Sequence, residues 1–179
     1  MKRWGLLCAG ILLFAGIASA QDNPKVEVFG GYSYLLSSVG GGYPTTNFNA
    51  GGSGSVAFNL NNWFGVVGDF GGYHTGNFAG FHTSANVISY TGGPKFSYRS
   101  DKFTLFAQSL FGGARVSSGG ASLNSFAMAL GGGADVNVSP HFAIRAIQAE
   151  YVLTRFKYGG GTPNSQNNAR ISVGVVIKF

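Results

Sequence analysis

The sequence has little cysteine, proline and charge, and each shortage excludes a class of protein. Its single cysteine, Cys8, lies within the first twenty residues, so the rest of the chain has no disulfide framework, thiol chemistry or cysteine-based metal site. Charged residues make up 10% of the chain and form no basic run, which argues against nucleic acid as a partner. The 30 glycines are interleaved with alternating apolar residues and only 5 prolines, which is not a low-complexity pattern.

The first twenty residues have the layout of a secretory signal. Two basic residues precede an apolar run over 4–17, and Ala18 and Ala20 form a small-residue cleavage site. The run is shorter than the ~20 residues that a membrane-spanning helix needs, which disfavours the alternative of a membrane anchor. We therefore predict a signal peptide over 1–20 and an exported barrel domain over 21–179.

Apolar residues in the exported part recur at every second position, which is the period of a β-strand and not of a helix. Eight segments show this alternation: 25–36, 49–60, 63–73, 85–98, 103–116, 126–138, 141–155 and 169–179. The sequence therefore predicts an all-β fold.

The connections between these segments alternate in length. Short polar turns such as Ser139-Pro140 alternate with longer stretches rich in Gly, Ser, Thr and Asn, at 37–48, 74–84, 117–125 and 156–168. Membrane barrels have short turns on one side and long loops on the other. We predict an eight-stranded antiparallel up-and-down transmembrane β-barrel with short periplasmic turns and long extracellular loops.

The aromatic residues help to decide which face of the barrel is apolar. A soluble barrel lines its interior with the apolar face, whereas a membrane barrel turns that face to lipid. Aromatics of the apolar face gather at the strand ends, as in interfacial girdles. They are Trp63, Phe64, Tyr98, Phe103 and Phe142 near the short turns, and Tyr34, Tyr73, Phe156 and Tyr158 near the long loops. The membrane barrel is favoured, with a soluble periplasmic barrel as the alternative.

The polar face carries isolated charges of both signs. Alternation along the strands places a set of them in the lumen: Glu27, Asp69, Lys95, Arg99, Arg115, Asp135, Arg170 and Lys178. Arg145 and Glu150 both join this set only if their strand contains a bulge. Because an unpaired buried charge is costly, we predict that each acid takes an Arg or Lys partner. The network is interpreted as a plug, with a conducting path as the alternative.

Residues 131–156, GGGADVNVSPHFAIRAIQAEYVLTRF, carry the most specific pattern in the chain. A glycine run leads into a strand, a Ser-Pro turn follows, and the next strand holds Arg145 and an acidic-aromatic pair, Glu150 and Tyr151. This unit resembles the sixth strand, turn and seventh strand of OmpA-like transmembrane domains. The resemblance implies a small outer-membrane β-barrel of a diderm bacterium. It does not imply a peptidoglycan-binding domain, since no residues follow the barrel.

The last strand resembles the outer-membrane assembly signal. Ser172, Gly174, Ile177 and Phe179 occupy the polar, glycine, antepenultimate apolar and terminal aromatic positions of that signal. By this resemblance, the barrel-assembly machinery recognises Phe179 through strand addition at a sheet edge. Periplasmic chaperones are further expected partners during biogenesis.

The sequence offers little for catalysis. Some eight-stranded barrels act on lipid A with a His and a Ser two residues apart and an acid nearby. His82 and Ser84 have this spacing but no neighbouring carboxylate, and neither His74 nor His141 has a serine two residues later. The glycine-rich 52–57 has no helix after it to form a dinucleotide site. We predict no enzyme, no cofactor and no metal site.

We expect a monomeric structural barrel that supports membrane integrity and presents its loops for surface interactions. Its expected partners are outer-membrane lipids and lipopolysaccharide, whose phosphates Arg155 and Lys157 are placed to meet. Two alternatives stay open, a narrow porin-like channel of low conductance and a lipid A-modifying enzyme.

Overall fold

The computed structural model describes residues 23–38, 45–77, 82–156 and 164–179. Every regular element in these residues is a β-strand: β1 (Val26–Ser37), β2 (Thr46–Phe48), β3 (Ala50–Asn59), β4 (Phe64–Thr75), β5 (Ala85–Arg99), β6 (Phe103–Ser118), β7 (Ala121–Ser139), β8 (Phe142–Phe156) and β9 (Asn164–Lys178). The described ranges contain no helix of the length and apolarity that crossing a membrane requires.

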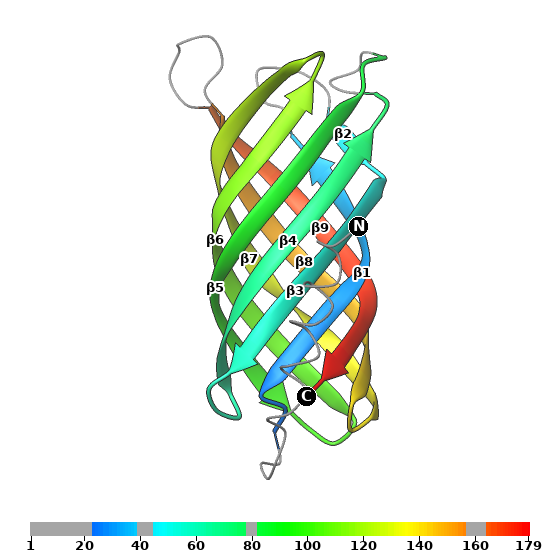
Figure 1. The fold of residues 1–179 in the computed structure, drawn as a ribbon, viewed down its shortest axis with the longest axis vertical. Helices are drawn as coiled ribbons and strands as arrows, with labels where there is room; N and C mark the ends of the chain where they lie inside the picture. Colours follow the sequence, from blue (N-terminus) through cyan, green and yellow to red (C-terminus); the bar gives the residue numbers. More distant parts are fainter. Residues whose placement is uncertain (1–22, 39–44, 78–81, 157–163) are drawn as a thin grey trace, which may run out of the picture.

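The strands form one closed antiparallel barrel with strongly tilted strands (Figure 1). From β3 to β9, each strand pairs with the next one along the chain, and β1 closes the sheet by pairing with both β3 and β9. The closing ladder is continuous from Glu27 opposite Lys178 to Ser37 opposite Asn168. The chain ends at the same end of the barrel as the short turns (Figure 1).

β2 and β3 together make one strand of the barrel, with an irregularity at Asn49. Tyr32 lies opposite Gly52 but Leu35 lies opposite Phe48, so the second strand contains one extra residue, as in a β-bulge. The Tyr32 hydroxyl donates to the Asn49 carbonyl at 2.5 Å. Past the bulge, Phe48 faces inward and is 1% exposed. The nine strand segments therefore form eight barrel strands, and the predicted fold is confirmed.

Several strands extend further outward than the sequence predicted. β7 begins at 121 instead of 126, and β9 begins at 164 instead of 169. Only Gly119 and Gly120 connect β6 to β7, and their φ angles of 58° and 82° suit a two-residue hairpin turn. The predicted long loop over 117–125 is therefore wrong, because this segment is the tip of a β-hairpin.

The short turns are closed by side chains that accept backbone hydrogen bonds. Asn61 Oδ1 accepts from the amides of Trp63 at 3.0 Å and Phe64 at 2.7 Å. Ser139 Oγ accepts from the amide of Phe142 at 3.1 Å. Asn and Ser favour turns because they offer the backbone such local partners.

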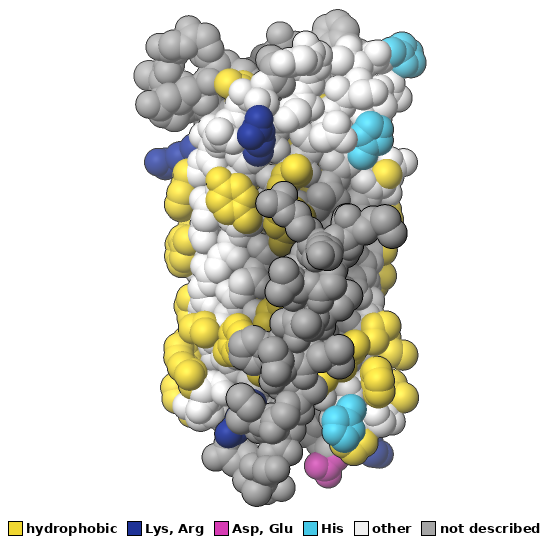
Figure 2. Space-filling view, in the orientation of Figure 1, with side chains coloured by type: hydrophobic (Ala, Val, Ile, Leu, Met, Phe, Trp, Pro, Cys, Tyr) yellow, Lys and Arg dark blue, Asp and Glu magenta, His cyan; other side chains and the backbone are white. Residues whose placement is uncertain are grey.

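The two faces of the barrel have opposite polarity. Leu105, Phe111 and Leu130 point outward and are about half exposed, whereas Glu27 and Asp69 point inward and are buried. Hydrophobic side chains cover the flanks of the barrel, while Lys, Arg and His side chains lie toward its two ends (Figure 2). This is the arrangement of a membrane barrel, with an apolar exterior and a polar lumen, and the predicted assignment of the faces is confirmed.

One aromatic of the predicted girdles was assigned to the wrong face. Trp63, Tyr98 and Phe103 face outward near the short turns, but Tyr73 faces the lumen and is 4% exposed. The motif FGGY occurs twice, yet its first Phe is buried at Phe29 and exposed at Phe70. The two copies of the motif therefore turn opposite ends to the lumen: the Phe faces inward in the first copy and the Tyr faces inward in the second. The side chain of Phe156 and the whole of Tyr158 lie outside the described residues.

Candidate functional site

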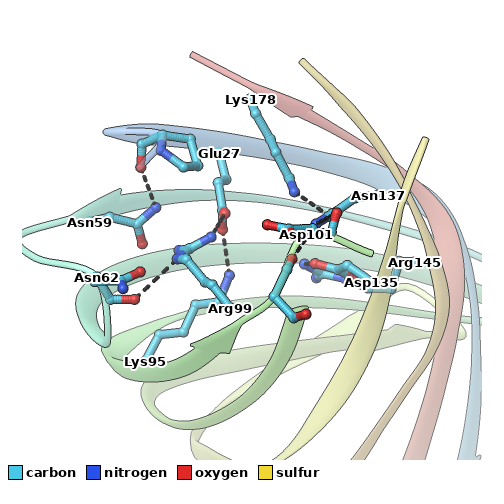
Figure 3. A network of polar contacts seen from close by, with 12 residues as sticks. Glu27, Asn59, Asn62, Lys95, Arg99, Asp101, Asp135, Asn137, Arg145 and Lys178 are labelled. Carbon is cyan, nitrogen blue, oxygen red and sulfur yellow. Dashed lines mark hydrogen bonds and ion pairs between the residues drawn. The ribbon is translucent and has the colours of Figure 1, made fainter. Parts of the chain in front are cut away.

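The lumen is crossed by ion pairs between strands that are not neighbours in the sheet. At the periplasmic end, Glu27 on β1 accepts from Lys95 Nζ at 2.7 Å and from Arg99 Nη1 at 2.5 Å, both on β5 (Figure 3). Arg99 Nε also donates to the Asn62 carbonyl at 3.2 Å. Because β1 and β5 are separated by two barrel strands, these bonds fix the two walls across the lumen.

A second set of contacts ties the last strand to the periplasmic turns. Lys178 Nζ donates to Asn137 Oδ1 at 2.6 Å, and Asn137 Nδ2 donates to the carbonyls of Ser100 at 3.0 Å and Asp101 at 3.1 Å (Figure 3). Lys178 forms no ion pair within the described ranges, although it is buried. Together with the Glu27 pairs, these contacts cross the periplasmic mouth of the barrel.

The middle of the lumen contains a guanidinium held between two aromatic rings. Arg145 makes a two-pronged bond to Asp135, with Nε–Oδ1 of 2.7 Å and Nη2–Oδ2 of 3.0 Å. Its Cζ lies 4.3 Å from the ring centroids of both Phe29 and Phe106. Such cation–π contacts strengthen when they are desolvated. The rings and the ion pair fill this level of the lumen.

Above it, Arg170 links three strands. Its Nε donates to Glu150 Oε2 on β8 at 2.6 Å, and its Nη1 donates to Asp69 Oδ1 on β4 at 2.7 Å. Nη1 also lies 3.2 Å from the Tyr73 hydroxyl. All three charged groups are at most 5% exposed, so one cation holds two buried carboxylates.

Gln148 joins the middle and upper sets into one network. Arg145 Nη1 donates to Gln148 Oε1 at 2.7 Å, and Gln148 Nε2 donates to Glu150 Oε2 at 2.8 Å. Gln108 adds a bond to the other oxygen of Glu150 at 2.9 Å. A continuous chain of bonds therefore runs from Asp135 to Asp69 by way of Arg145, Gln148, Glu150 and Arg170.

A bulge in β8 makes this network geometrically feasible. Arg145 lies opposite Gly174 and Gln148 opposite Ser172, so three residues of β8 span two of β9. Ala146 and Ile147 both face outward, while Arg145 and Gln148 both face inward. The sequence analysis required a bulge between Arg145 and Glu150 but missed Gln148, which shares the parity of Glu150 and could have been recognised on that basis.

Arg115 was assigned to the wrong face. It is exposed on the outer surface of β6, where its Nη2 donates to Ser122 Oγ at 2.9 Å. Phe103, Leu105 and Phe111 lie on the same face of the strand, because all are an even number of residues from Arg115. Arg115 is therefore no part of the lumenal network. The other charged residues that the sequence placed in the lumen lie there, and each of the four acids among them has an Arg or Lys partner.

The extracellular half of the lumen contains an apolar cluster. Leu35, Phe48, Tyr73 and Val87 form a buried cluster there. The space that remains between these side chains and Arg170 is about 40 Å³, which is room for no more than a few water molecules. Ser37, Thr154, Gln166 and Asn168 line the same space, so above the charged network the lumen is narrow and lined by both apolar and polar side chains.

The residues of the proposed assembly signal lie on both faces of β9. Ser172 is buried and bonded to Ser33 Oγ at 2.7 Å, whereas Ile177 and Phe179 face outward. Phe179 pairs with Val26 through two backbone hydrogen bonds, of 2.9 and 3.2 Å. Gly174 lies opposite Gly31 at the closing seam. The predicted cleavage residues, Ala18 and Ala20, lie outside the described residues.

The three histidines lie at the two ends of the barrel. Within the described ranges, no three His, Cys, Asp or Glu residues are grouped to hold a metal ion. His74 Nδ1 lies 2.8 Å from Asn86 Oδ1 at the extracellular end, while His141 lies in a periplasmic turn. The lumen instead holds fixed charges, in which four carboxylates are paired with Lys95, Arg99, Arg145 and Arg170.

Comparison with known structures gives the same architecture. The protein is similar to the attachment invasion locus protein Ail of Yersinia pestis, at 20% identity and a TM-score of 0.56 over 88% of this chain and 99% of that one. It is also similar to Neisserial surface protein A, at 16% identity and a TM-score of 0.63 over 86% and 96% of the two chains. The N-terminal β-barrel domain of Pseudomonas aeruginosa OprF matches at 9% identity and 0.55, over 88% and 99%.

At these identities the likeness shows the fold alone. No curated protein sequence matches the chain significantly. A sequence model described as the outer membrane protein beta-barrel domain matches residues 6–179, which is nearly the whole chain. The protein therefore belongs to the outer membrane β-barrel domain family, and its place is the outer membrane.

Proposed function

We propose that this protein is a structural, non-conducting barrel that supports the outer membrane and presents its extracellular end for surface contacts. The ion pairs that cross the lumen carry this proposal. Five buried ion pairs link β1 to β5, β7 to β8, and β4 and β8 to β9. Eight strands enclose a space that side chains can fill, and here they fill it with ion pairs below the apolar cluster of Leu35, Phe48, Tyr73 and Val87.

The porin-like alternative requires a water-filled path, and it can be tested directly. We expect purified barrels in planar bilayers to show no regular single-channel steps in 1 M KCl, because the cavity beside Arg170 holds only a few waters. Phe48→Ala is the matched variant, since Phe48 is a fully buried side chain of the apolar cluster that lines this cavity. Regular openings of the wild type that Phe48→Ala enlarges would show a conducting lumen and contradict the proposal.

We propose no catalytic step for the second alternative, a lipid A-modifying enzyme. All the Asp and Glu side chains of the described residues lie in the lumen or in a periplasmic turn, whereas His74 and His82 lie at the extracellular end, near the end of β4 and the start of β5. A histidine that activates a serine needs an acid to orient it. Lipid A from cells with and without the protein should have the same mass spectrum, and a difference would reopen this alternative.

The terminal aromatic residue gives a prediction about biogenesis. We expect Phe179→Ala to lower the amount of folded barrel in the outer membrane several-fold, because we propose that the assembly machinery binds this end by strand addition. Folded barrel is scored as the band that migrates fast on SDS gels before boiling and slowly afterwards. Val173→Ala removes an exposed apolar side chain from the same strand and serves as the control. Equal losses for the two variants would argue against an assembly signal at Phe179.

Other parts of the functional proposal follow from the fold and the sequence. We propose that the barrel acts as a monomer, with membrane lipids and lipopolysaccharide as its neighbours and with periplasmic chaperones guiding its export. The cleavage of a signal peptide after Ala20 stays a prediction, which the N-terminal sequence of the protein isolated from outer membranes would test.

A further inference from the structure

A row of polar side chains crosses four neighbouring strands on the outer surface of the extracellular end. His74 lies opposite Asn86, Asn86 opposite Ser117, and Ser117 opposite Ser122, so the row runs without a gap from β4 to β7. These four residues, the polar row, replace the apolar side chains found nearer the membrane centre on the same faces. Ile88, for example, follows Asn86 on the outer face of β5 and is 42% exposed.

The polar row lies where these strands leave the membrane. A tilted strand needs about 9–11 residues to cross the hydrocarbon layer. Counted upward from the exposed Phe103 at the periplasmic end of β6, that length ends near Gly113, just short of Arg115. The polar row and Arg115 therefore lie at the level of lipid headgroups and of the sugars above them.

Arg115 lies beside the polar row in a shallow pocket, the Arg115 pocket. This pocket is lined by Ser84, Asn86, Arg115, Ser117, Ser118, Gly119, Gly120 and Ser122. Arg115 Nη2 donates to Ser122 Oγ at 2.9 Å, and Ser118 Oγ donates to the Ser84 carbonyl at 3.1 Å. Its walls are the three paired strands β5, β6 and β7 and the tight turn between β6 and β7, and such elements fix a polar site better than a long loop does.

The charges around the pocket are of one sign. The six acidic residues of the sequence are at positions 22, 27, 69, 101, 135 and 150, and those within the described ranges lie in the lumen or in a periplasmic turn. The outer face of the extracellular end carries Arg115 and Arg155, both exposed. Because no carboxylate of the described residues competes for it, the Arg115 guanidinium is complementary to an external anion.

We propose that the Arg115 pocket binds a phosphate or sulfate group carried by a sugar. The guanidinium provides the fork of N–H donors that suits a tetrahedral oxyanion. The serine hydroxyls and the Asn86 amide provide donors and acceptors for the ring hydroxyls beside it. The inference rests on the proposed function in one respect, since it requires that this end of the barrel faces the outside of the cell.

The binding can be measured on the refolded barrel in micelles of an uncharged detergent. Glucosamine 1-phosphate is titrated while the amide NMR signals of Gly119 and Gly120 are followed, and glucosamine without the phosphate is the negative probe. We expect saturable shifts with the phosphate sugar only. Arg115→Gln should weaken binding about tenfold, the equivalent of one charge-assisted hydrogen bond.

Two control variants separate a defined pocket from a general positive charge. Lys102→Gln removes the same charge from an exposed periplasmic turn and should leave the affinity unchanged. Arg155→Gln removes a cation from the same end and should have a much smaller effect than Arg115→Gln. An equal loss in the Arg115 and Arg155 variants, or no saturable shifts in the wild type, would overturn the proposal. Heat-modifiable migration of each sample shows that the barrel is folded, so that such a failure counts against the pocket and not against the barrel.

The phosphate can come from lipopolysaccharide in the same leaflet or from a soluble glycan, and vesicles distinguish the two. The titration is repeated in phosphatidylcholine vesicles with and without lipopolysaccharide. Competition by lipopolysaccharide in the wild type, absent in Arg115→Gln, assigns the pocket to the membrane's own glycolipid. Undiminished binding of glucosamine 1-phosphate in both kinds of vesicle assigns it to a soluble ligand.

Discussion

Replacing Arg170 with methionine is expected to destabilise the barrel by about 3–5 kcal/mol, the usual cost of removing one partner from a buried ion pair. Arg170 donates to both Glu150 and Asp69, and all three groups are buried. Its removal leaves two carboxylates beside a cavity that has room for only a few waters. The loss should therefore reflect uncompensated buried charge more than lost packing, since methionine retains much of the side-chain volume.

Unfolding in urea from phospholipid vesicles measures this effect. Trp63 is the one tryptophan after the predicted cleavage site and faces outward, so its fluorescence reports insertion. Adding Glu150→Gln and Asp69→Asn to the Arg170→Met variant should recover most of the stability, because neither carboxylate that lost its Arg170 partner remains charged. Arg155→Met, on the outer face, should change stability by less than about 0.5 kcal/mol. A triple variant no more stable than Arg170→Met would mean that packing, not charge, makes Arg170 important.

The sequence predicts the membrane part of this barrel well because lipid and lumen impose opposite chemistry on alternate residues. In β5, for example, Ile88, Tyr90 and Phe96 face lipid while Lys95 and Ser97 face the lumen. This contrast exists only where lipid touches the outer face. Above the membrane both faces of a strand can be polar, so the period of two fades from the sequence.

The wrong strand boundaries lie where that contrast is lost. Residues 122–125 of β7 include Ser122, Asn124 and Ser125, and the start of β9 reads NSQNN. Neither stretch alternates, yet both pair fully with their neighbours. The error at Arg115 has the same origin, because a charged side chain was taken as a sign of the lumen at a height where the outer face is also polar.

The pairing partners in the lumen could not be derived from the sequence. The order of the strands predicts which backbones are neighbours, but Glu27 bonds to Lys95 and Arg99 across the barrel. Such contacts depend on how the strands are staggered around the barrel, which no local pattern encodes. The β8 bulge adds a second unknown, because its position decides whether Gln148 can connect Arg145 to Glu150.

A second substitution with a large expected effect on stability lies at the seam where β1 pairs with β9 and closes the barrel. Gly31 lies opposite Gly174, and a methyl group on Gly31 would overlap the carbonyl oxygen of Val173 and the Cα atom of Gly174. Because both of those atoms belong to the backbone, neither can move without distorting the ladder that closes the barrel. We expect Gly31→Ala to cost about 1–3 kcal/mol or more, as overpacking does elsewhere. Unfolding in urea, followed by Trp63 fluorescence, measures the loss.

The neighbouring residue provides a matched control for the seam. A methyl group on Gly30 would point outward and meet nothing within 4 Å. Gly30→Ala should therefore be neutral or stabilising by up to about 1 kcal/mol, because alanine loses less backbone entropy than glycine. The same substitution at two adjacent glycines is thus expected to lower the free energy of unfolding at Gly31 and to leave it unchanged or raise it at Gly30. Equal effects at the two positions would show that glycine is needed along β1 for flexibility and not for the close approach of β9.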